Sequence, residues 1–176
     1  MNRLLQRWLE REKPLFPKLR AIPLFRELNR REMEAVVQLI EIRKYSTGDV
    51  VFEQGAPGDG VYVVLKGYVE VVQKDGEEDK KVLLAQSESG SFFGETALLK
   101  GVPRTATAVA TEDTKLALFS RDALHQLAEQ RPHLGVKIPI QLSRIVAERL
   151  RQTNHSLQVA RDELAAKQKE DGEDES

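Results

Sequence analysis

The sequence contains no cysteine. This absence excludes disulfide bonds, thiol catalysis and thiolate metal sites, and it is compatible with a reducing compartment. Long apolar runs are also lacking, since none approaches the roughly 18 residues that span a bilayer. Glu10 and Glu12 interrupt the N-terminal stretch that a signal peptide would need. We therefore expect a cytoplasmic protein with no membrane association.

Neither sign of charge dominates, because 27 Lys and Arg residues stand against 28 Asp and Glu residues. Direct DNA binding would call for a clustered basic excess, so we do not expect it. Histidine is scarce: His125, His133 and His155 all lie in expected helices. No two histidines stand two residues apart on a strand, as a jelly-roll metalloenzyme would need, and no serine–histidine–acid arrangement stands out. We therefore expect no enzymatic activity, no metal site and no cofactor.

The 176 residues suffice for one domain with appendages. Residues 2–12 form an expected amphipathic helix, which either docks on the domain or contacts a membrane surface or partner. Pro14, Pro17 and Pro23 should then interrupt regular structure. Asn29 is a suitable N-cap for a helix that ends near Ile40.

Short β-rich runs separated by turn residues occupy the region from Tyr45 to Phe119. Many short strands at such spacing indicate a sandwich or barrel. We expect an α+β fold, in which an antiparallel β-roll or jelly-roll barrel is flanked by N-terminal helices and a long C-terminal helix. The candidate strands are residues 50–53, 61–65, 68–74, 80–86, 106–111 and 115–119.

Helical periodicity returns after Ser120, which can cap a helix that runs to about Gln130 and is ended by Pro132. A long helix over about 136–167 should follow, with Pro139 in its first turn or at a kink. Apolar and small residues recur along it at alternating spacings of four and three. This period of about 3.5 is typical of a two-chain coiled coil, so we expect a homodimer, with packing on its own domain as the alternative. The repeating positions are Val146, Leu150, Thr153, Leu157, Ala160 and Leu164.

The run from Phe93 to Thr107 contains the most informative residues. Glu95 can only accept hydrogen bonds at neutral pH, which suits ribose hydroxyls. Arg104 offers a rigid fork of donors, which suits phosphate oxygens. The short turn Ala97–Leu99 comes just after Glu95 and could present free backbone N–H groups to an anion. If they bind no ligand, Glu95 and Arg104 should pair with each other or lie on the surface of a loop.

This run resembles the phosphate-binding cassette of the cyclic nucleotide-binding domain family, and the alignment from Phe93 to Ala106 needs no gap. Residues 48–52 and 58–67 resemble the early glycine-bounded strands of that family, and Ile22–Phe25 resembles its entry into the domain. The resemblance covers about residues 20–155. Together with the patterns along the chain, it divides the sequence into an N-terminal helical extension (1–20) and the binding domain with the start of the long helix (21–155). The period of the long helix adds a coiled-coil-like remainder (156–168), and the charged, apolar-free composition of the last residues predicts a disordered acidic tail (169–176).

The resemblance implies that Glu95 binds the ribose 2′-hydroxyl and Arg104 the cyclic phosphate. In relatives of the bacterial cyclic-AMP receptor type, a hydroxyl pair on the dimer helix reads adenine, and Thr153-Asn154 occupies a similar place here; Thr153 otherwise fixes the register of the seam. The implied ligand residues are Gly94, Glu95, Thr96, Ala97, Leu98, Arg104, Thr105 and Ala106, and the candidate base contacts are Val61, Val71, Leu83, Ala85, Thr153 and Asn154.

The function we expect is that of a cyclic nucleotide sensor, with cAMP as the first candidate ligand and cGMP as the second. Ligand binding would shift the long helix and so signal to an unidentified effector protein. A truncated or partner-dependent transcription regulator of the cyclic-AMP receptor family is one alternative, although the chain ends in an acidic segment that would repel DNA. A scaffold that has lost its ligand is the other, and the presence of both Glu95 and Arg104 argues against it.

Overall fold

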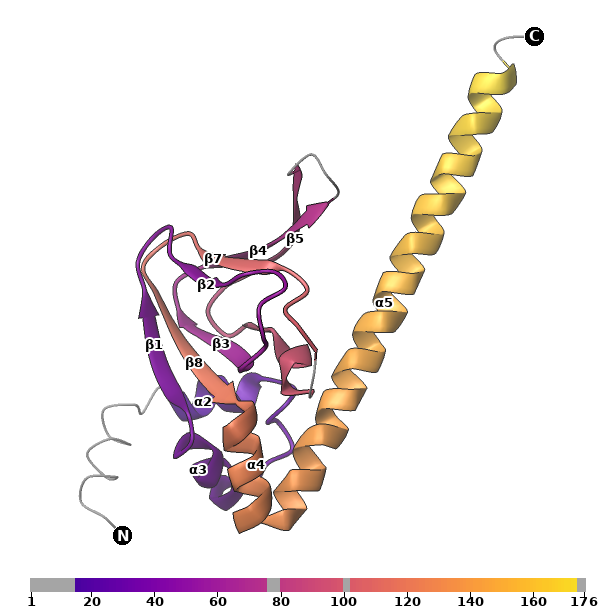
Figure 1. Ribbon diagram of the computed structural model, residues 1–176. Helices are drawn as coiled ribbons and strands as arrows, with labels where there is room; N and C mark the ends of the chain where they lie inside the picture. Colours follow the sequence, from indigo (N-terminus) through magenta and orange to yellow (C-terminus); the bar gives the residue numbers. More distant parts are fainter. Residues whose placement is uncertain (1–14, 76–79, 100–101, 174–176) are drawn as a thin grey trace.

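The computed structural model describes residues 15–75, 80–99 and 102–173 (Figure 1). The expected helix over residues 2–12 lies outside these ranges. None of the helices within them is long and apolar enough to cross a lipid bilayer.

Two antiparallel four-stranded sheets form the body of the molecule, and they confirm the expected roll (Figure 1). One sheet has the strand order β1-β8-β3-β6 and the other has the order β2-β7-β4-β5. The strands are β1 (Glu41–Tyr45), β2 (Val50–Phe52), β3 (Gly60–Lys66), β4 (Val69–Asp75), β5 (Lys80–Ser87), β6 (Phe92–Phe93), β7 (Thr107–Ala110) and β8 (Thr114–Ser120).

Strand β8 shows how the sequence builds two cores, because successive side chains point to opposite faces of a sheet. Leu116 and Leu118 pack between the two sheets. Ala117 and Phe119 face the other way and pack against helices. The central strand is therefore apolar at successive positions, and it holds the roll and the helical layer together.

Within the described residues, four α-helices and one short 3₁₀ turn accompany the sheets. They are α2 (Leu15–Ala21), α3 (Arg30–Val37), η1 (Glu95–Leu98), α4 (Arg121–Gln130) and α5 (Pro132–Glu173). Both expected caps are present: the Asn29 side chain accepts from the Glu32 N–H in a capping box, and Ser120 Oγ accepts from the Ala123 N–H. The expected interruption at Pro17 is wrong, because Pro17 lies in the first turn of α2, where a missing N–H removes no helical hydrogen bond.

Helix α5 begins at Pro132 and contains Pro139 in its interior. Its first part packs on α4 and the core through Leu134, Ile138 and Leu142. Its second part runs past the roll as a long arm (Figure 1). The helix includes residues 169–173 of the segment expected to be a tail, and residues 174–176 lie outside the described ranges.

Candidate functional site

Arg104 is a buried cation of the cassette, with only 4% of its surface exposed. Its Nη2 donates to Asp59 Oδ1 at 2.5 Å and to the Gly60 carbonyl at 3.0 Å, and its Nη1 donates to the Gly94 carbonyl at 3.0 Å. The guanidinium carbon lies 3.9 Å from the centre of the Phe52 ring. Its Nε is buried and has no partner. The position of this cation is therefore fixed, while one donor stays available.

Gly94 allows this close approach of the backbone to the guanidinium. Its φ of +73° is in the left-handed region, and a Cβ there would lie 2.3 Å from Arg104 Nη1. A larger residue would be strained and would also displace the cation. The turn η1 starts at the next residue, so Gly94 sets the direction in which the Glu95 side chain leaves the backbone.

Glu95 is a buried carboxylate, with 3% of its surface exposed. Its Oε1 accepts a hydrogen bond from Arg149 Nη1 at 2.5 Å, although Arg149 lies 54 positions later on α5. Its Oε2 is buried without a partner. A buried carboxylate oxygen without a donor is costly, so this atom points to a missing hydrogen-bond donor.

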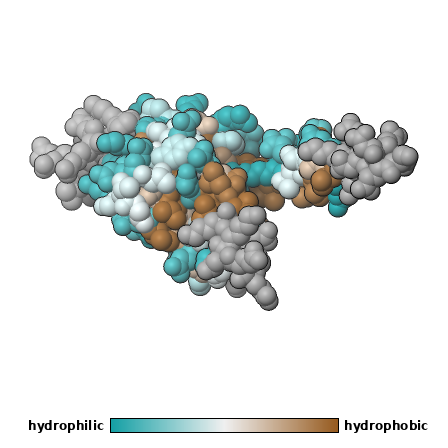
Figure 2. All heavy atoms as spheres, turned by 90° about the horizontal axis from the view of Figure 1, so that it is seen from above, coloured by the Kyte–Doolittle hydropathy of each residue, from teal (hydrophilic) through white to brown (hydrophobic). Residues whose placement is uncertain are grey.

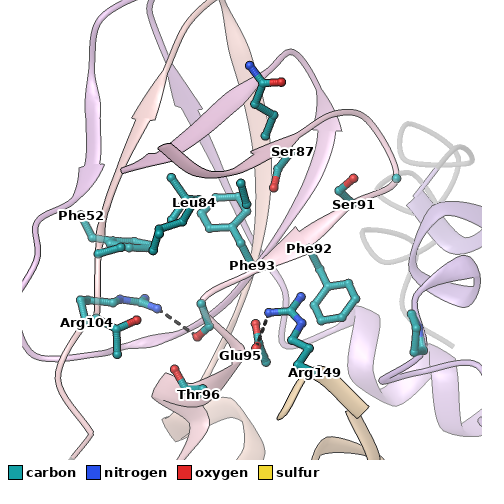
Figure 3. Close-up of a pocket in the computed structure, with 18 residues that line it drawn as sticks. Phe52, Leu84, Ser87, Ser91, Phe92, Phe93, Glu95, Thr96, Arg104 and Arg149 are labelled. Atoms are coloured by element: carbon teal, nitrogen blue, oxygen red, sulfur yellow. Dashed lines mark hydrogen bonds and ion pairs between the residues drawn. The ribbon is translucent and has the colours of Figure 1, made fainter. Parts of the chain in front are cut away.

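A cavity of about 510 Å³ contains both groups and falls within the size range of small-molecule sites (Figure 3). Arg104 and Glu95 lie on one side, and Arg149 approaches from α5 (Figure 3). The lining residues are Pro23, Phe52, Val71, Leu84, Ala85, Gln86, Ser87, Gly90, Ser91, Phe92, Phe93, Gly94, Glu95, Thr96, Arg104, Thr105, Ala106 and Arg149.

Most of the expected cassette residues line this cavity, and some expected residues do not. Those brought together are Gly94, Glu95, Thr96, Arg104, Thr105, Ala106, Val71 and Ala85. Ala97 and Leu98 are buried in the turn itself, and the Ala97 N–H donates to the Gly94 carbonyl at 3.1 Å. Val61 is buried in the core on the helical side, and Leu83 is exposed on β5. Thr153 and Asn154 are exposed on α5 and are not among the lining residues.

The suggested pairing of Glu95 with Arg104 is wrong. Each has its own partner, Arg149 for the carboxylate and Asp59 for the guanidinium. Both partners come from segments far away in the sequence, so the two cassette charges are held apart at one cavity.

Asp59 was not expected at the site, yet it connects Arg104 to a wider network. Its Oδ2 accepts from the Tyr62 hydroxyl at 3.0 Å and from Arg43 Nη1 at 3.2 Å. Burial, followed by the negative charge of Asp59, raises the pKa of Tyr62. Tyr62 therefore stays a neutral donor at physiological pH, and it keeps Asp59 oriented toward Arg104.

Aromatic side chains were also missed at this site. Phe52, Tyr62 and Phe93 form a cluster with ring centres 5.6–5.8 Å apart. Phe92 lies beneath Arg149, whose guanidinium carbon is 5.1 Å from the ring centre. Phe92 and Phe93 are adjacent residues of strand β6, so their side chains point to opposite faces of the sheet. Nothing in the local sequence indicated that Phe52 would contact Phe93.

Known proteins similar to this chain agree on its family. The family model described as the cyclic nucleotide-binding domain matches residues 42–131. The cAMP-dependent protein kinase regulatory subunit of Colletotrichum orbiculare is 35% identical over 109 residues, which are 62% of this chain and 27% of that protein. The CRP-like cAMP-activated global transcriptional regulator of Mycobacterium tuberculosis is 29% identical over 136 residues, which are 76% of this chain and 58% of that protein.

Among solved structures, the catabolite activator protein of Thermus thermophilus is 30% identical and superposes with a TM-score of 0.70 over 78% of this chain and 62% of that chain. The chain spans about a quarter of the length of the kinase regulatory subunits that it matches. From the family match, the roll and the cassette, we conclude that this chain belongs to the cyclic nucleotide-binding domain family.

Proposed function

We propose that the cavity binds a cyclic nucleotide, with cAMP as the first candidate and cGMP as the second. The observation that carries this proposal is the pair of enclosed, incompletely satisfied charges at one cavity, Glu95 Oε2 and Arg104 Nε. A sugar phosphate supplies both missing partners, because its hydroxyls donate to a carboxylate and its phosphate accepts from a guanidinium. The names of the kinase regulatory subunit and the CRP-like regulator support cAMP.

The cyclic phosphate pairs with Arg104 in this proposal, and the ribose 2′-hydroxyl donates to Glu95. A cyclic phosphodiester carries one negative charge, which one arginine neutralises. The phosphate takes the unpartnered Nε of Arg104 and shares the guanidinium with Asp59, which pairs with Nη2 and orients the cation. Backbone N–H groups near Ala97 and Leu98 complete the phosphate site, which requires the Ala97 N–H to turn from the Gly94 carbonyl.

The base lies against the apolar wall formed by Val71, Leu84 and Ala85 on β4 and β5. Thr153 follows Arg149 by one helical turn, so a small approach of α5 to the roll brings its hydroxyl toward the base. Thr153 and Asn154 are therefore proposed as base contacts in a state in which α5 lies closer to β4 and β5.

Helix α5 senses the ligand directly, because Arg149 occupies one oxygen of the carboxylate that binds the ribose. A ligand shifts α5 only if it binds two arrangements of this helix with different affinity. A ribose hydroxyl that binds Glu95 changes the strength of the Arg149 contact, and this gives the ligand different affinities for the two arrangements of α5. The output is the position of α5, which an effector protein reads.

A second copy of the chain is the proposed partner of the α5 arm. Leu150, Leu157 and Leu164 each expose about half or more of their surface and repeat at seven-residue intervals. Apolar side chains on one stripe at this spacing form the seam of a coiled coil. Figure 2, which looks down on the molecule, shows apolar surface near its centre and again toward the end of the arm. This distribution supports a homodimer through α5.

The chain acts as a regulatory module without enzymatic activity in this proposal. Its similarity to transcriptional regulators favours one other candidate, the nucleotide-binding part of a DNA-binding regulator. Electrophoretic mobility of DNA fragments with the purified chain and cAMP separates the two, since only the second candidate predicts a ligand-dependent complex.

Isothermal titration calorimetry with cAMP and cGMP tests the ligand. We expect one nucleotide bound per chain, with cAMP bound more tightly. If neither nucleotide produces heat that saturates, the proposed function is wrong. If cGMP binds more tightly than cAMP, the proposed site stands and cGMP becomes the first candidate ligand.

A further inference from the structure

Another cavity, of about 330 Å³, lies at the end of strand β1 and the start of β8. It shares no lining residue with the ligand cavity. Figure 1 shows β1 on the side of the roll away from the α5 arm. Lys44, Lys66 and Lys115 line this cavity, and among its described lining residues Asp113 is the only acid. The cavity therefore concentrates positive charge.

The three lysines lie side by side because their strands are neighbours. Strand β8 lies between β1 and β3 in one sheet. Lys115 on β8 is opposite Lys44 on one side and opposite Lys66 on the other. Directly opposite residues share one face of a sheet and have Cβ atoms about 4.5–5.5 Å apart. The lysines thus form a row of like charges, and such cross-strand pairs are destabilising.

An irregularity in β3 creates one half of this row. Val64 is opposite Leu116, and the next pair in a regular antiparallel ladder would be Leu65 with Lys115. The register shifts at this point, so Lys66 takes the place opposite Lys115 instead, while Leu65 is buried in the core on the helical side. Bulges are common beside active sites, where they re-aim a side chain. Here the bulge places a charged residue where an apolar one would otherwise stand.

The residues that line the cavity do not balance this charge. Within the described ranges of the chain, the side chains of Lys44 and Lys66 make no hydrogen bond or ion pair. The lining residues supply three ammonium groups and one carboxylate, which leaves a formal surplus of two positive charges. An anion bound among these lysines would offset their mutual repulsion.

The size and charge of the cavity indicate which kind of anion fits. Its volume is at the lower end of the range of small-molecule sites. Strands β1 and β3 are two strand spacings apart, about 10 Å, so the outer lysines reach a ligand from opposite ends. Ammonium groups bind phosphate as point charges, and two linked phosphates carry the multiple negative charge that matches the surplus. Ser46 adds a hydroxyl that can donate to a phosphate oxygen.

We propose that this cavity is a second anion site, which binds a small soluble molecule that carries two linked phosphate groups. Lys44 and Lys66 contact the phosphates from opposite ends, and Lys115 lies between them. Neither Glu95 nor Arg104 lines this cavity, so a ligand here leaves the cassette accessible. Binding at this site does not depend on the proposed function of the cassette.

Calorimetric titration of the full chain with pyrophosphate tests this site. The double variant Lys44→Gln, Lys66→Gln changes two exposed positions in the cavity. The matched control Arg26→Gln, Arg31→Gln removes two positive charges from exposed positions elsewhere. A second control, Arg104→Gln, removes the buried cation of the cassette, where a phosphate could also bind. Circular dichroism checks that each variant folds, and NMR signals of the backbone amides locate the bound probe.

We expect saturable binding of pyrophosphate that shifts the amide signals of Ser46 and Lys115, with inorganic phosphate bound more weakly. The lysine double variant should raise Kd at least about tenfold, because two charge-assisted contacts are lost. Both controls should stay within about twofold of the wild type, because charges farther away than a Debye length are largely screened. If the lysine double variant does not fold, Lys44→Gln and Lys66→Gln are measured singly, and each should raise Kd.

Three outcomes would overturn the inference. The first is the absence of saturable pyrophosphate binding by the folded wild-type chain. The second is an equal loss of affinity in either control, which would assign binding to diffuse surface charge or to the cassette. The third is binding to phosphatidylcholine vesicles that contain phosphatidylinositol 4-phosphate without binding of pyrophosphate, which would assign the lysines to a lipid headgroup.

Discussion

Replacement of Arg104 by glutamine removes the cation that we assign to the phosphate. The bound state loses up to two charge-assisted hydrogen bonds of about 1.5–3 kcal/mol each. The free protein also loses the bond from Arg104 to Asp59, and the ligand competes with this bond for the same guanidinium, so the net loss lies toward the lower end. A loss of about 3 kcal/mol corresponds to roughly a hundredfold increase in Kd.

Calorimetric titration of Arg104→Gln with cAMP measures this loss, and circular dichroism shows whether the variant folds. We expect it to fold, because Asp59 is partly exposed and keeps its contacts with Arg43 and Tyr62. Arg104→Lys retains the charge without the fork and should fall between the wild type and Arg104→Gln. Arg31→Gln, at an exposed position on α3, is the control. An unchanged Kd in Arg104→Gln would refute the phosphate assignment.

The wild type should bind 2′-deoxy-cAMP at least about tenfold more weakly than cAMP, and Glu95→Gln should reduce this ratio in the same titration; equal ratios would remove the ribose assignment. Leu157→Glu should produce monomers in light scattering while Ser156→Glu remains dimeric, and a dimeric Leu157→Glu would contradict the α5 seam. Lys137 Nζ donates to Glu32 Oε2 at 2.9 Å, so Lys137→Met should lower the free energy of unfolding in urea by about 1 kcal/mol at pH 7, and by less as the pH falls through the folded pKa of Glu32; a loss that does not change with pH would contradict the role of Glu32.

The sign of this pH dependence follows from the environment of Glu32. Burial alone would raise its pKa, but the hydrogen bonds from Lys137 and the Asn29 backbone, with the charge of Lys137, lower it below 4.5. A carboxylate with a lowered pKa stabilises the folded state above its unfolded pKa. That contribution is lost as the pH falls through the folded pKa, so the Lys137 contact matters little in acid.

Elements set by local chemistry could be predicted from the sequence. Asn29 and Ser120 begin helices because their side chains accept from backbone N–H groups of the first turn. Strand β1 was missed, because its residues are Glu, Ile, Arg, Lys and Tyr, and charged residues carry no strand signal. It is a strand because all five residues pair with β8, an interaction between segments about 70 positions apart.

The candidate site could likewise be predicted only where its residues lie close together in the sequence. Glu95 and Arg104 lie in one short run, so their chemistry could be predicted together. The role of Arg149 could not be predicted, because it depends on how α5 passes the cassette. In the sequence, Arg149 is one of many charged residues of a long helix. Asp59 appeared only within the stretch 58–67 that resembles an early strand of the family, and its role depends on a contact across 45 positions.

We propose that a cyclic nucleotide occupies the cavity between the cassette and α5. A competition titration of the wild-type chain with cAMP and cGMP tests it most directly. We expect saturable binding of cAMP at one site per chain, with cGMP competing more weakly for that site. Absence of saturable binding of either nucleotide, by a chain shown to be folded, would contradict the claim.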